Sequence, residues 1–479
     1  MYRIRYLICR LLKYVSNLTF CILIIEKKMR NYLDRVLVKL FNIHPVKAIS
    51  VFTPTSSAEA NYVCRPKLED LITKSLLTPG KQLLLFGHSG SGKTTLIRRV
   101  LKLNSIDSIK THCEAASTFN DILYAAFDSL NKFVVDEKNA TRGQSIMGKL
   151  AIEYQNINSE ITTELSEENN TKMVRLLPPQ LTPQKLAQFF GEGKLVWIIE
   201  DFHKVADKEK KRIADLLKIF VDNANDYKSS KVICIGACEN AVDLVKLEPD
   251  LKTRVDEIKV HMLSEEEIRK LITNGCALLN LDIAPELLDK ISYYSSHIAS
   301  TAHQMCLDIC LAKNIEQRRW KKGQLYDSDF NTAVKGYIKA NEGSFSIAYD
   351  VAIRNELGWY ILKTFSNNSH QKLSFEEIKR IVNKSHKTFT DKEIKDKLNE
   401  LCNSELGVLF YSSSADKYML ASPYWQSFLR IQFAQEAAEK QRAKKKHKFK
   451  IVDQNSRDAY VDQLMFELIK GYRMSIKHD

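Results

Sequence analysis

Proline and glycine are scarce in this 479-residue chain, at 10 and 16 residues respectively. This excludes collagen-like and low-complexity architectures, which need a much larger share of both residues. None of the ten cysteines forms a Cys-x-x-Cys pair, so the sequence does not predict a zinc ribbon. Unpaired, scattered thiols indicate an intracellular, reducing compartment, cytoplasmic or nuclear. With 44% hydrophobic and 27% charged residues, the chain has the composition of a folded globular protein.

A long uncharged hydrophobic run is also missing. The most apolar stretch, residues 7–25, contains Arg10 and Lys13, whereas a membrane span needs about 20 apolar residues with few charges. No small-residue cleavage site follows it, which argues against a secretory signal. Three interpretations stay open: a basic amphipathic surface helix, a weak membrane anchor, or residues that precede a working start at Met29.

Positive charge is concentrated at the two ends of the sequence. The net charge is +14, of which residues 1–30 carry +6 and residues 440–450 carry +7. The rest of the chain is therefore nearly neutral. Such a distribution differs from that of a uniformly basic nucleic-acid-binding protein.

Alternating strand and helix signals predict an α/β fold with a mainly parallel sheet. Apolar runs at residues 83–86, 194–201 and 231–237 are typical of buried strands. From Ser264, which forms a predicted capping box with Glu267, the pattern is helical. Three helices and a hairpin then predict a winged helix-turn-helix domain. The predicted segments are a basic and apolar lead-in, an α/β core, a helical subdomain with a linker, a winged-helix domain and a basic C-terminal extension: residues 1–50, 51–263, 264–343, 344–433 and 434–479.

The most specific motif is a complete Walker A sequence, Gly87-x-x-x-x-Gly92-Lys93-Thr94, between a predicted strand and a predicted helix. Its glycines let backbone N–H groups turn inward, and the helix N-terminus adds its dipole, so the loop can bind phosphates. Lys93 is expected to contact the β- and γ-phosphates, and the Thr94 hydroxyl to bind Mg²⁺. The predicted nucleotide-binding residues of the loop are Gly87, His88, Ser89, Gly90, Ser91, Gly92, Lys93, Thr94 and Thr95.

Two acids end the apolar strand VWIIED, as expected of a Walker B strand. Glu200 takes the position that holds the Mg²⁺ shell, and Asp201 takes the position that orients the attacking water. The usual order of these residues is Asp then Glu. The exchange keeps both roles but weakens the prediction of hydrolysis.

The order of motifs over roughly residues 50–430 resembles AAA+ ATPases of the origin-recognition or initiator type, and is also similar to related STAND-like ATPases. The segments that carry it are VFTPTS, Cys64-Arg65-Pro66, the Walker A loop, IIEDFH, IGACENAVDLV, LKTRVDEIKVHMLSEEEI and the winged helix. The resemblance implies a P-loop NTPase core with a helical lid and a C-terminal winged helix. It also implies homo- or hetero-oligomers that form through the core.

The same resemblance implies roles for single residues outside the Walker motifs. Asn240 falls at the sensor 1 position, and Arg254 at that of an arginine finger, which reaches the nucleotide of a neighbouring subunit. Arg65 is placed near the nucleotide base. The lid lacks the arginine that related ATPases carry, and His303 is the nearest polar candidate for that place.

The C-terminal charges leave the partner open. The presumed recognition helix, residues 391–402, has a net charge of −1, and the preceding helix, residues 376–387, has +2. Three roles of the predicted winged helix therefore stay open: contact with DNA, packing against a protein partner, and packing against its own ATPase core. The tail at 440–450 is predicted to bind polyanions, with an anionic membrane surface or a solvated helix end as alternatives.

The motifs and the resemblance together predict an ATPase that binds ATP and Mg²⁺ and releases ADP and phosphate. We expect it to act as a nucleotide-dependent switch in DNA-associated assembly, similar to replication initiators at origins or to transposition regulators. A STAND-like signalling or defence ATPase with protein partners and a non-hydrolysing scaffold are the alternatives. ATP is expected rather than GTP because no guanine-specificity motif is present.

Overall fold

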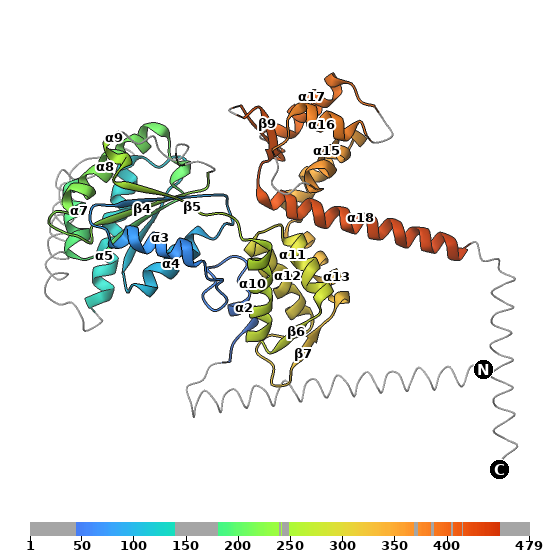
Figure 1. Ribbon diagram of the computed structural model, residues 1–479, viewed down its shortest axis with the longest axis horizontal. Helices are drawn as coiled ribbons and strands as arrows, with labels where there is room; N and C mark the ends of the chain where they lie inside the picture. The colour runs from blue at the N-terminus through green and yellow to red at the C-terminus, as the bar shows by residue number, and fades with distance from the viewer. Residues whose placement is uncertain are drawn as a thin grey trace, which may run out of the picture. The chain divides into compact units, whose positions relative to one another are not determined.

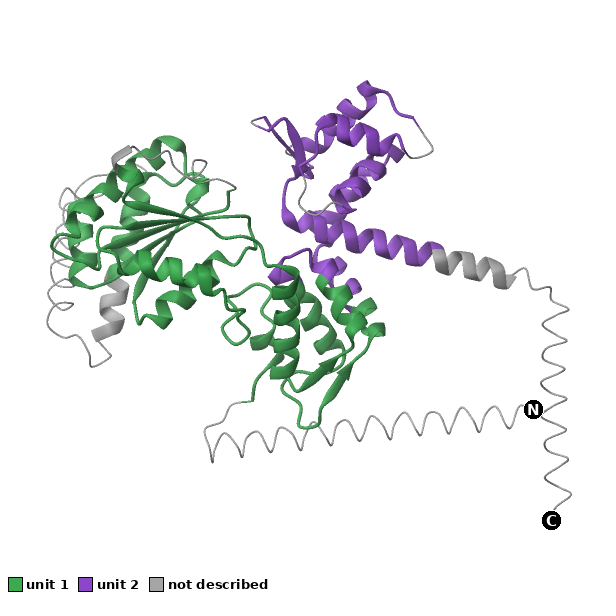
Figure 2. Ribbon diagram, viewed as in Figure 1, with its two compact units in different colours: residues 1–292, 302–332 green, residues 293–301, 333–479 purple. Residues whose placement is uncertain are grey.

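The computed structural model describes residues 45–138, 181–238, 241, 249–367, 372–384, 388–403, 406–413 and 415–450. The chain divides into two compact units, residues 1–292 with 302–332 and residues 293–301 with 333–479 (Figure 2). The lead-in up to residue 44, the segment 139–180 and the chain after residue 450 lie outside the described residues. The boundaries of the five predicted segments stay predictions.

A five-stranded parallel sheet forms the core of the first unit (Figure 1). Its strand order is β2-β3-β4-β1-β5, and every pairing within it is parallel. The carboxyl ends of all five strands therefore lie at one edge. The prediction of an α/β core with a mainly parallel sheet is confirmed. The strands are β1 (Gln82–Phe86), β2 (Ser108–His112), β3 (Val196–Glu200), β4 (Lys231–Gly236) and β5 (Val255–Lys259).

Helices cover both faces of this sheet because alternate strand residues point to opposite sides. Leu83 and Leu85 of β1 pack with the helices α3 and α4, whereas Leu84 and Phe86 pack with α5, α7 and α8. The second face holds Trp197, whose fully buried indole ring stacks on Phe190. The helices are α3 (Pro66–Leu77), α4 (Lys93–Leu103), α5 (Phe119–Lys138), α7 (Pro183–Glu192) and α8 (Asp207–Asn223).

A helical subdomain follows the sheet, as predicted, and we call it the lid. Ser264 and Glu267 form the expected capping box at the start of α10. The short helix α2 joins the lid because the Ala48 N–H donates to the Glu316 carbonyl. The elements are α2 (Ala48–Val51), α10 (Glu265–Leu278), α11 (Pro285–Ser295), α12 (Ala299–Ala312) and the parallel pair β6 (Leu281–Ile283) and β7 (Gly323–Leu325).

In the second unit, α13 and α14 are followed by three helices, a hairpin and a long final helix, in the predicted order. The helices α16 and α17 each begin with a capping box, formed by Ser374 with Glu377 and by Thr390 with Glu393. Helix α18 packs against α15, and its Glu436 accepts hydrogen bonds from Tyr349 and Trp359. The elements are α13 (Phe330–Ala340), α14 (Ile347–Ala352), α15 (Glu356–Asn367), α16 (Phe375–Val382), α17 (Asp391–Cys402), β8 (Leu409–Ser412), β9 (Lys417–Leu420) and α18 (Pro423–Lys450).

The cysteines of the described residues are all free thiols, in keeping with their spacing. Burial raises the pKa of Cys113 and of Cys276 to about 12, so both thiols stay protonated at neutral pH. Over the described part of the chain, no helix combines the length and the apolar character that crossing a bilayer requires.

Gly358 allows the close turn between α14 and α15. A Cβ atom at this position would lie 1.9 Å from the Ala352 carbonyl oxygen and 2.8 Å from Lys397 Cε. A Cβ atom at Gly343, in the same unit, would meet no heavy atom within 4 Å. The two glycines therefore form a matched pair, one confined and one open.

We expect Gly358→Ala to lower the free energy of unfolding by about 2 kcal/mol or more, because the new methyl group overlaps a backbone carbonyl. Gly343→Ala is expected to change it by less than about 1 kcal/mol, with stabilisation favoured by the gain in helix propensity. Urea denaturation followed by circular dichroism measures both. Equal midpoints for the two variants would contradict the packing described here.

Candidate functional site

The Walker A loop connects β1 to α4 at the carboxyl edge of the sheet. Gly87, Gly90 and Gly92 all have positive φ angles, and Gly92 is the residue that precedes the first turn of α4. The predicted nucleotide-binding residues 87–95 are thus contiguous, with the helix N-terminus behind them. Backbone N–H groups at such a terminus, together with the helix dipole, form a site for a phosphate group.

Gly87 is needed for a second reason, which is close contact with the neighbouring strand. A Cβ atom at this position would lie 2.2 Å from the carbonyl oxygen of Val260, directly after β5. The Val260 N–H in turn donates to the Phe86 carbonyl at 2.7 Å. The first loop residue is therefore held against the end of β5, where only glycine fits.

Lys93 is buried and folds back onto its own loop. Its ammonium group donates to the carbonyl oxygens of Gly87 at 2.7 Å and His88 at 2.8 Å. Burial lowers the pKa of Lys93 to about 8, although the nearby groups of Cys238 and Asp201 act in the opposite direction. A bound phosphate would supply the negative charge that this ammonium group lacks, and would raise its pKa again.

The two Walker B acids have different surroundings. Glu200 ends β3, is largely buried, and lies 2.9 Å from Lys110 Nζ and 3.6 Å from His112 Nδ1. Asp201 follows with a left-handed backbone (φ 57°) and is paired at 2.8 Å with Lys204, both side chains being about half exposed. The first acid thus lies against β2 at the edge of the sheet, and the second lies in the turn that follows, paired with Lys204.

The ion pair of Glu200 was not predicted from the sequence. Strand β2 pairs with β3 so that His112 lies opposite Glu200, and Lys110 lies two residues earlier on the same face. Alternation along β2 would have shown that Lys110 and His112 share a face. No feature of the sequence shows that this strand, almost 90 residues away, is the neighbour of β3.

The residues at this edge suit a hard divalent cation such as Mg²⁺. Mg²⁺ binds oxygen ligands, and Thr94 and Glu200 supply a hydroxyl and a carboxylate. Glu200 Oε1 is buried, and its contact with Lys110 lacks the geometry of a hydrogen bond. Thr94 and Glu200 would therefore hold the ion, in competition with the Lys110 ammonium group.

The end of β4 is tied to the Walker B segment. His203 Nδ1 accepts a hydrogen bond from the Ala237 N–H at 3.1 Å, and burial lowers the pKa of this histidine. Cys238 follows at the same edge. Asn240, the predicted sensor 1 residue, lies outside the described residues, so its role stays a prediction.

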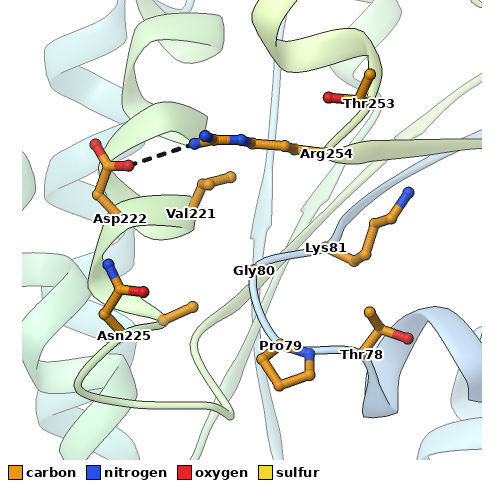
Figure 3. Close-up of a pocket in the computed structure, with 10 residues that line it drawn as sticks. Thr78, Pro79, Gly80, Lys81, Val221, Asp222, Asn225, Thr253 and Arg254 are labelled. Atoms are coloured by element: carbon orange, nitrogen blue, oxygen red, sulfur yellow. Dashed lines mark ion pairs between the residues drawn. The ribbon is translucent and has the colours of Figure 1, made fainter.

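Arg254 lies at the opposite edge of the sheet. Its carbonyl accepts the Gln82 N–H at the start of β1, one strand length (about 15 Å) from the Walker A loop. Its guanidinium is half exposed, 3.5 Å from Asp222 at a pocket of about 320 Å³ that Asn225 and Lys81 also line (Figure 3). Arg254 therefore does not join the other predicted residues within one chain.

Arg65 is buried and held by three protein groups. Its Nη1 donates to the Ser91 carbonyl of the Walker A loop at 3.2 Å, and its Nη2 to the His261 carbonyl at 2.8 Å. Its Nε lies 3.5 Å from Glu267 of α10. The structure places Arg65 beside the Walker A loop, with its guanidinium joining the loop to the lid. Its predicted place near the nucleotide base stays a prediction.

His303 is buried in the lid and is not a source of positive charge. Its Nδ1 accepts the Thr53 N–H at 3.2 Å, and its ring meets Phe52 edge-on. Burial lowers the pKa of His303 to about 4, so the ring is neutral at physiological pH. It therefore does not replace the missing lid arginine.

Comparison with known proteins agrees with this geometry. Residues 78–239 match a family model described as an AAA domain. No curated protein matches the chain. The matched stretch holds the Walker A loop, the Walker B strand and β4. The match to an AAA domain confirms the prediction of an AAA+ type core.

Solved structures with a similar fold include a Walker-type ATPase of Pyrococcus abyssi, at 14% identity and a TM-score of 0.46, covering 78% of this chain and 98% of that one. The ORC2 protein of Aeropyrum pernix has 14% identity and a TM-score of 0.44, and the match covers 83% of this chain and 100% of that one. Cdc6p from Pyrobaculum aerophilum has 14% identity and a TM-score of 0.40, and the match covers 81% of this chain and 97% of that one. At these identities and TM-scores, the structural similarity carries no statement about the function of this chain.

We expect the chain to take up protons when it binds ATP near pH 8.5. Lys93, with a pKa of about 8, is mostly neutral there, and bound phosphates shift its pKa upward, so more than about half a proton is taken up. Calorimetry in buffers of different ionisation enthalpy measures this uptake. The control is Lys102→Met, on the exposed side of α4, which is expected to show the same proton uptake as the wild type. Binding without proton uptake would contradict the pKa assigned to Lys93.

We expect Lys110→Met to increase the dependence of ATP affinity on Mg²⁺. Without Lys110, Glu200 repels phosphates when the metal is absent and binds Mg²⁺ without a competitor when it is present. The ratio of the Kd values in EDTA and in Mg²⁺ should rise about 5-fold or more. Lys102→Met is the control. An unchanged ratio in Lys110→Met would show that the ion pair does not affect the metal site.

Proposed function

We propose that the chain is an AAA+ ATPase that binds ATP with Mg²⁺, hydrolyses it slowly, and uses its nucleotide state to switch a DNA-associated assembly. One observation supports this most directly. Lys93 lies buried under a glycine-rich loop at the edge of the sheet where Glu200 and Asp201 also end. A buried lysine whose partners are two backbone carbonyls and the Ser91 hydroxyl, with no carboxylate among them, is a group prepared for an anion.

Each residue of the edge has a task in this proposal. The ammonium group of Lys93 turns from the Gly87 and His88 carbonyls to the β- and γ-phosphates. Asp201, near Lys93 and half exposed, orients the attacking water and accepts its proton. Thr94 and Glu200 would hold Mg²⁺, which would supply positive charge to the phosphate oxygens.

Arg254 acts on a different subunit in this proposal. It lies at the edge opposite its own Walker A loop and keeps an exposed guanidinium. An arginine so placed reaches a nucleotide only if a second subunit brings its loop to it. This supports an oligomer formed through the core, with Arg254 stabilising the charge of the transition state.

The second unit supports DNA contact through α16 rather than α17. The helices α15 to α17 and the hairpin β8-β9 follow the order of a winged helix. The exposed charges of α17 are mostly acidic, because its Lys397 is buried against Glu400. Arg380 of α16 and Lys384, two residues after the end of this helix, are exposed and line a groove. We therefore assign the phosphate contacts to these two side chains.

The test is ATP hydrolysis by the chain with and without duplex DNA, at low and at moderate salt. We expect several-fold stimulation by DNA that disappears in Lys93→Ala and in Glu200→Gln/Asp201→Asn. Arg380→Gln/Lys384→Gln should weaken DNA binding about 10-fold at low salt and lower its salt dependence by about two phosphate contacts. The matched pair on α17, Lys392→Gln/Lys395→Gln, should change it less than about 3-fold.

Each other result excludes a part of the proposal. A rate of ATP hydrolysis that is the same with and without DNA would exclude DNA as the partner. It would leave a nucleotide-dependent switch that works through proteins. Equal losses in the α16 and α17 pairs would exclude α16 as the contact surface.

A nucleotide-dependent scaffold without turnover is the second candidate, and two observations favour it. The Lys110 ammonium group already pairs with Glu200, the acid that would hold Mg²⁺, and the lid histidine His303 is neutral. Both features reduce the positive charge and metal affinity that a hydrolysing site uses. Tight ATP binding without release of phosphate, with or without DNA, would favour this candidate over the first.

A further inference from the structure

An exposed tryptophan lies within a short basic loop of the lid, far along the sequence from the Walker motifs. The loop, residues 318–322, reads Arg-Arg-Trp-Lys-Lys and carries four positive charges and no acid. Trp320 is 60% exposed. Within the described part of the chain, its ring contacts no other aromatic ring and no cation. An exposed indole among cations is an unusual surface for a folded protein and indicates a binding function.

The backbone of this loop is held rigidly. The Arg319 N–H donates to the Leu279 carbonyl, and the Gly323 N–H to the Asn280 carbonyl, both at 3.0 Å. The Asn280 side-chain amide donates to the carbonyls of Arg319 at 2.9 Å and Trp320 at 3.3 Å. The loop thus presents its tryptophan from a fixed frame, and little conformational entropy is lost when a ligand binds.

The cations of the loop divide into structural and available ones. Arg318 Nη1 donates to the carbonyls of Ala277 and Leu278 and so caps the end of α10. Lys322 is exposed and pairs with the equally exposed Asp282 at 2.9 Å. Lys321 is exposed directly beside Trp320. Lys321 is therefore the charge best placed to meet an anionic group next to a stacked ring.

We propose that this loop binds single-stranded nucleic acid, with Trp320 stacked on an unpaired base and Lys321 on a flanking phosphate. A flat exposed ring beside a cation matches the alternation of base and phosphate along a single strand. A duplex keeps its bases stacked inside, so it offers no partner to the ring. The next apolar side chains on either side, Ile315 and Leu325, are buried, so the loop lacks the continuous apolar area that membrane docking needs.

This site goes beyond the proposed function, because it lies in the lid and not in the second unit. It requires neither ATP hydrolysis nor duplex binding by α16. Binding is measured without nucleotide, so a failure of the ATPase proposal leaves this test unaffected.

The test is fluorescence anisotropy of a labelled 20-nucleotide oligo-dT with the full chain at moderate salt, where binding by charge alone is weak. Trp320→Ala is expected to weaken binding about 5-fold or more, and Trp320→Phe to restore much of it, since a phenyl ring also stacks. Lys321→Gln should reduce the salt dependence. Leu311→Ala and Lys270→Gln, which change exposed residues of α12 and α10, should leave the affinity within about 2-fold.

Two results would overturn the proposal. The first is an unchanged oligo-dT affinity in Trp320→Ala, or an equal loss for a duplex of the same length. The second is a loss of binding to phosphatidylserine vesicles in Trp320→Ala while oligo-dT binding is retained, which would assign the loop to a membrane. Equal far-ultraviolet circular dichroism of wild type and Trp320→Phe confirms that the rescue compares folded proteins.

Discussion

The parallel register of the five strands is the constraint on which the site depends. Because β1, β3 and β4 run in the same direction, each ends at the same edge, and the residues after each end meet there. The Walker A loop follows β1, Glu200 is the last residue of β3, and Asp201 follows it. The same register sends Arg254, before β5, to the far edge. The Walker residues and Arg254 are thus separated by the length of one strand.

Lys93 and Lys231 are buried lysines of the first unit whose ammonium groups donate to protein oxygens. Lys93 donates to the Gly87 and His88 carbonyls of the Walker A loop. Lys231, at the start of β4, donates to the carbonyls of Ser75, Thr78 and Lys81 and so caps the end of α3. Lys110, which is partly exposed, instead forms an ion pair with Glu200. Acceptors therefore offset the cost of burial for both Lys93 and Lys231.

The sequence allowed the strands β1, β3 and β4 and the Walker motifs to be predicted, since each depends on residues close together in the chain. Strand β5 was not predicted. An apolar run, a glycine loop and a helix signal are contiguous, and so are the strand VWII and the acids after it. Contacts between distant segments could not be predicted in this way. The pairing of Lys110 with Glu200 depends on which strands are neighbours. The three partners of Arg65 depend on how the loop, the end of β5 and α10 meet.

Arg65 also gives the fold a property that none of its partners has alone. Its guanidinium joins the Ser91 carbonyl of the loop, the His261 carbonyl after β5 and the Glu267 carboxylate of α10. A guanidinium is planar and presents its donors in fixed directions, so one side chain sets the arrangement of all three groups. The Walker A loop and the helix α10 of the lid are thereby connected through a single buried residue of the same polypeptide.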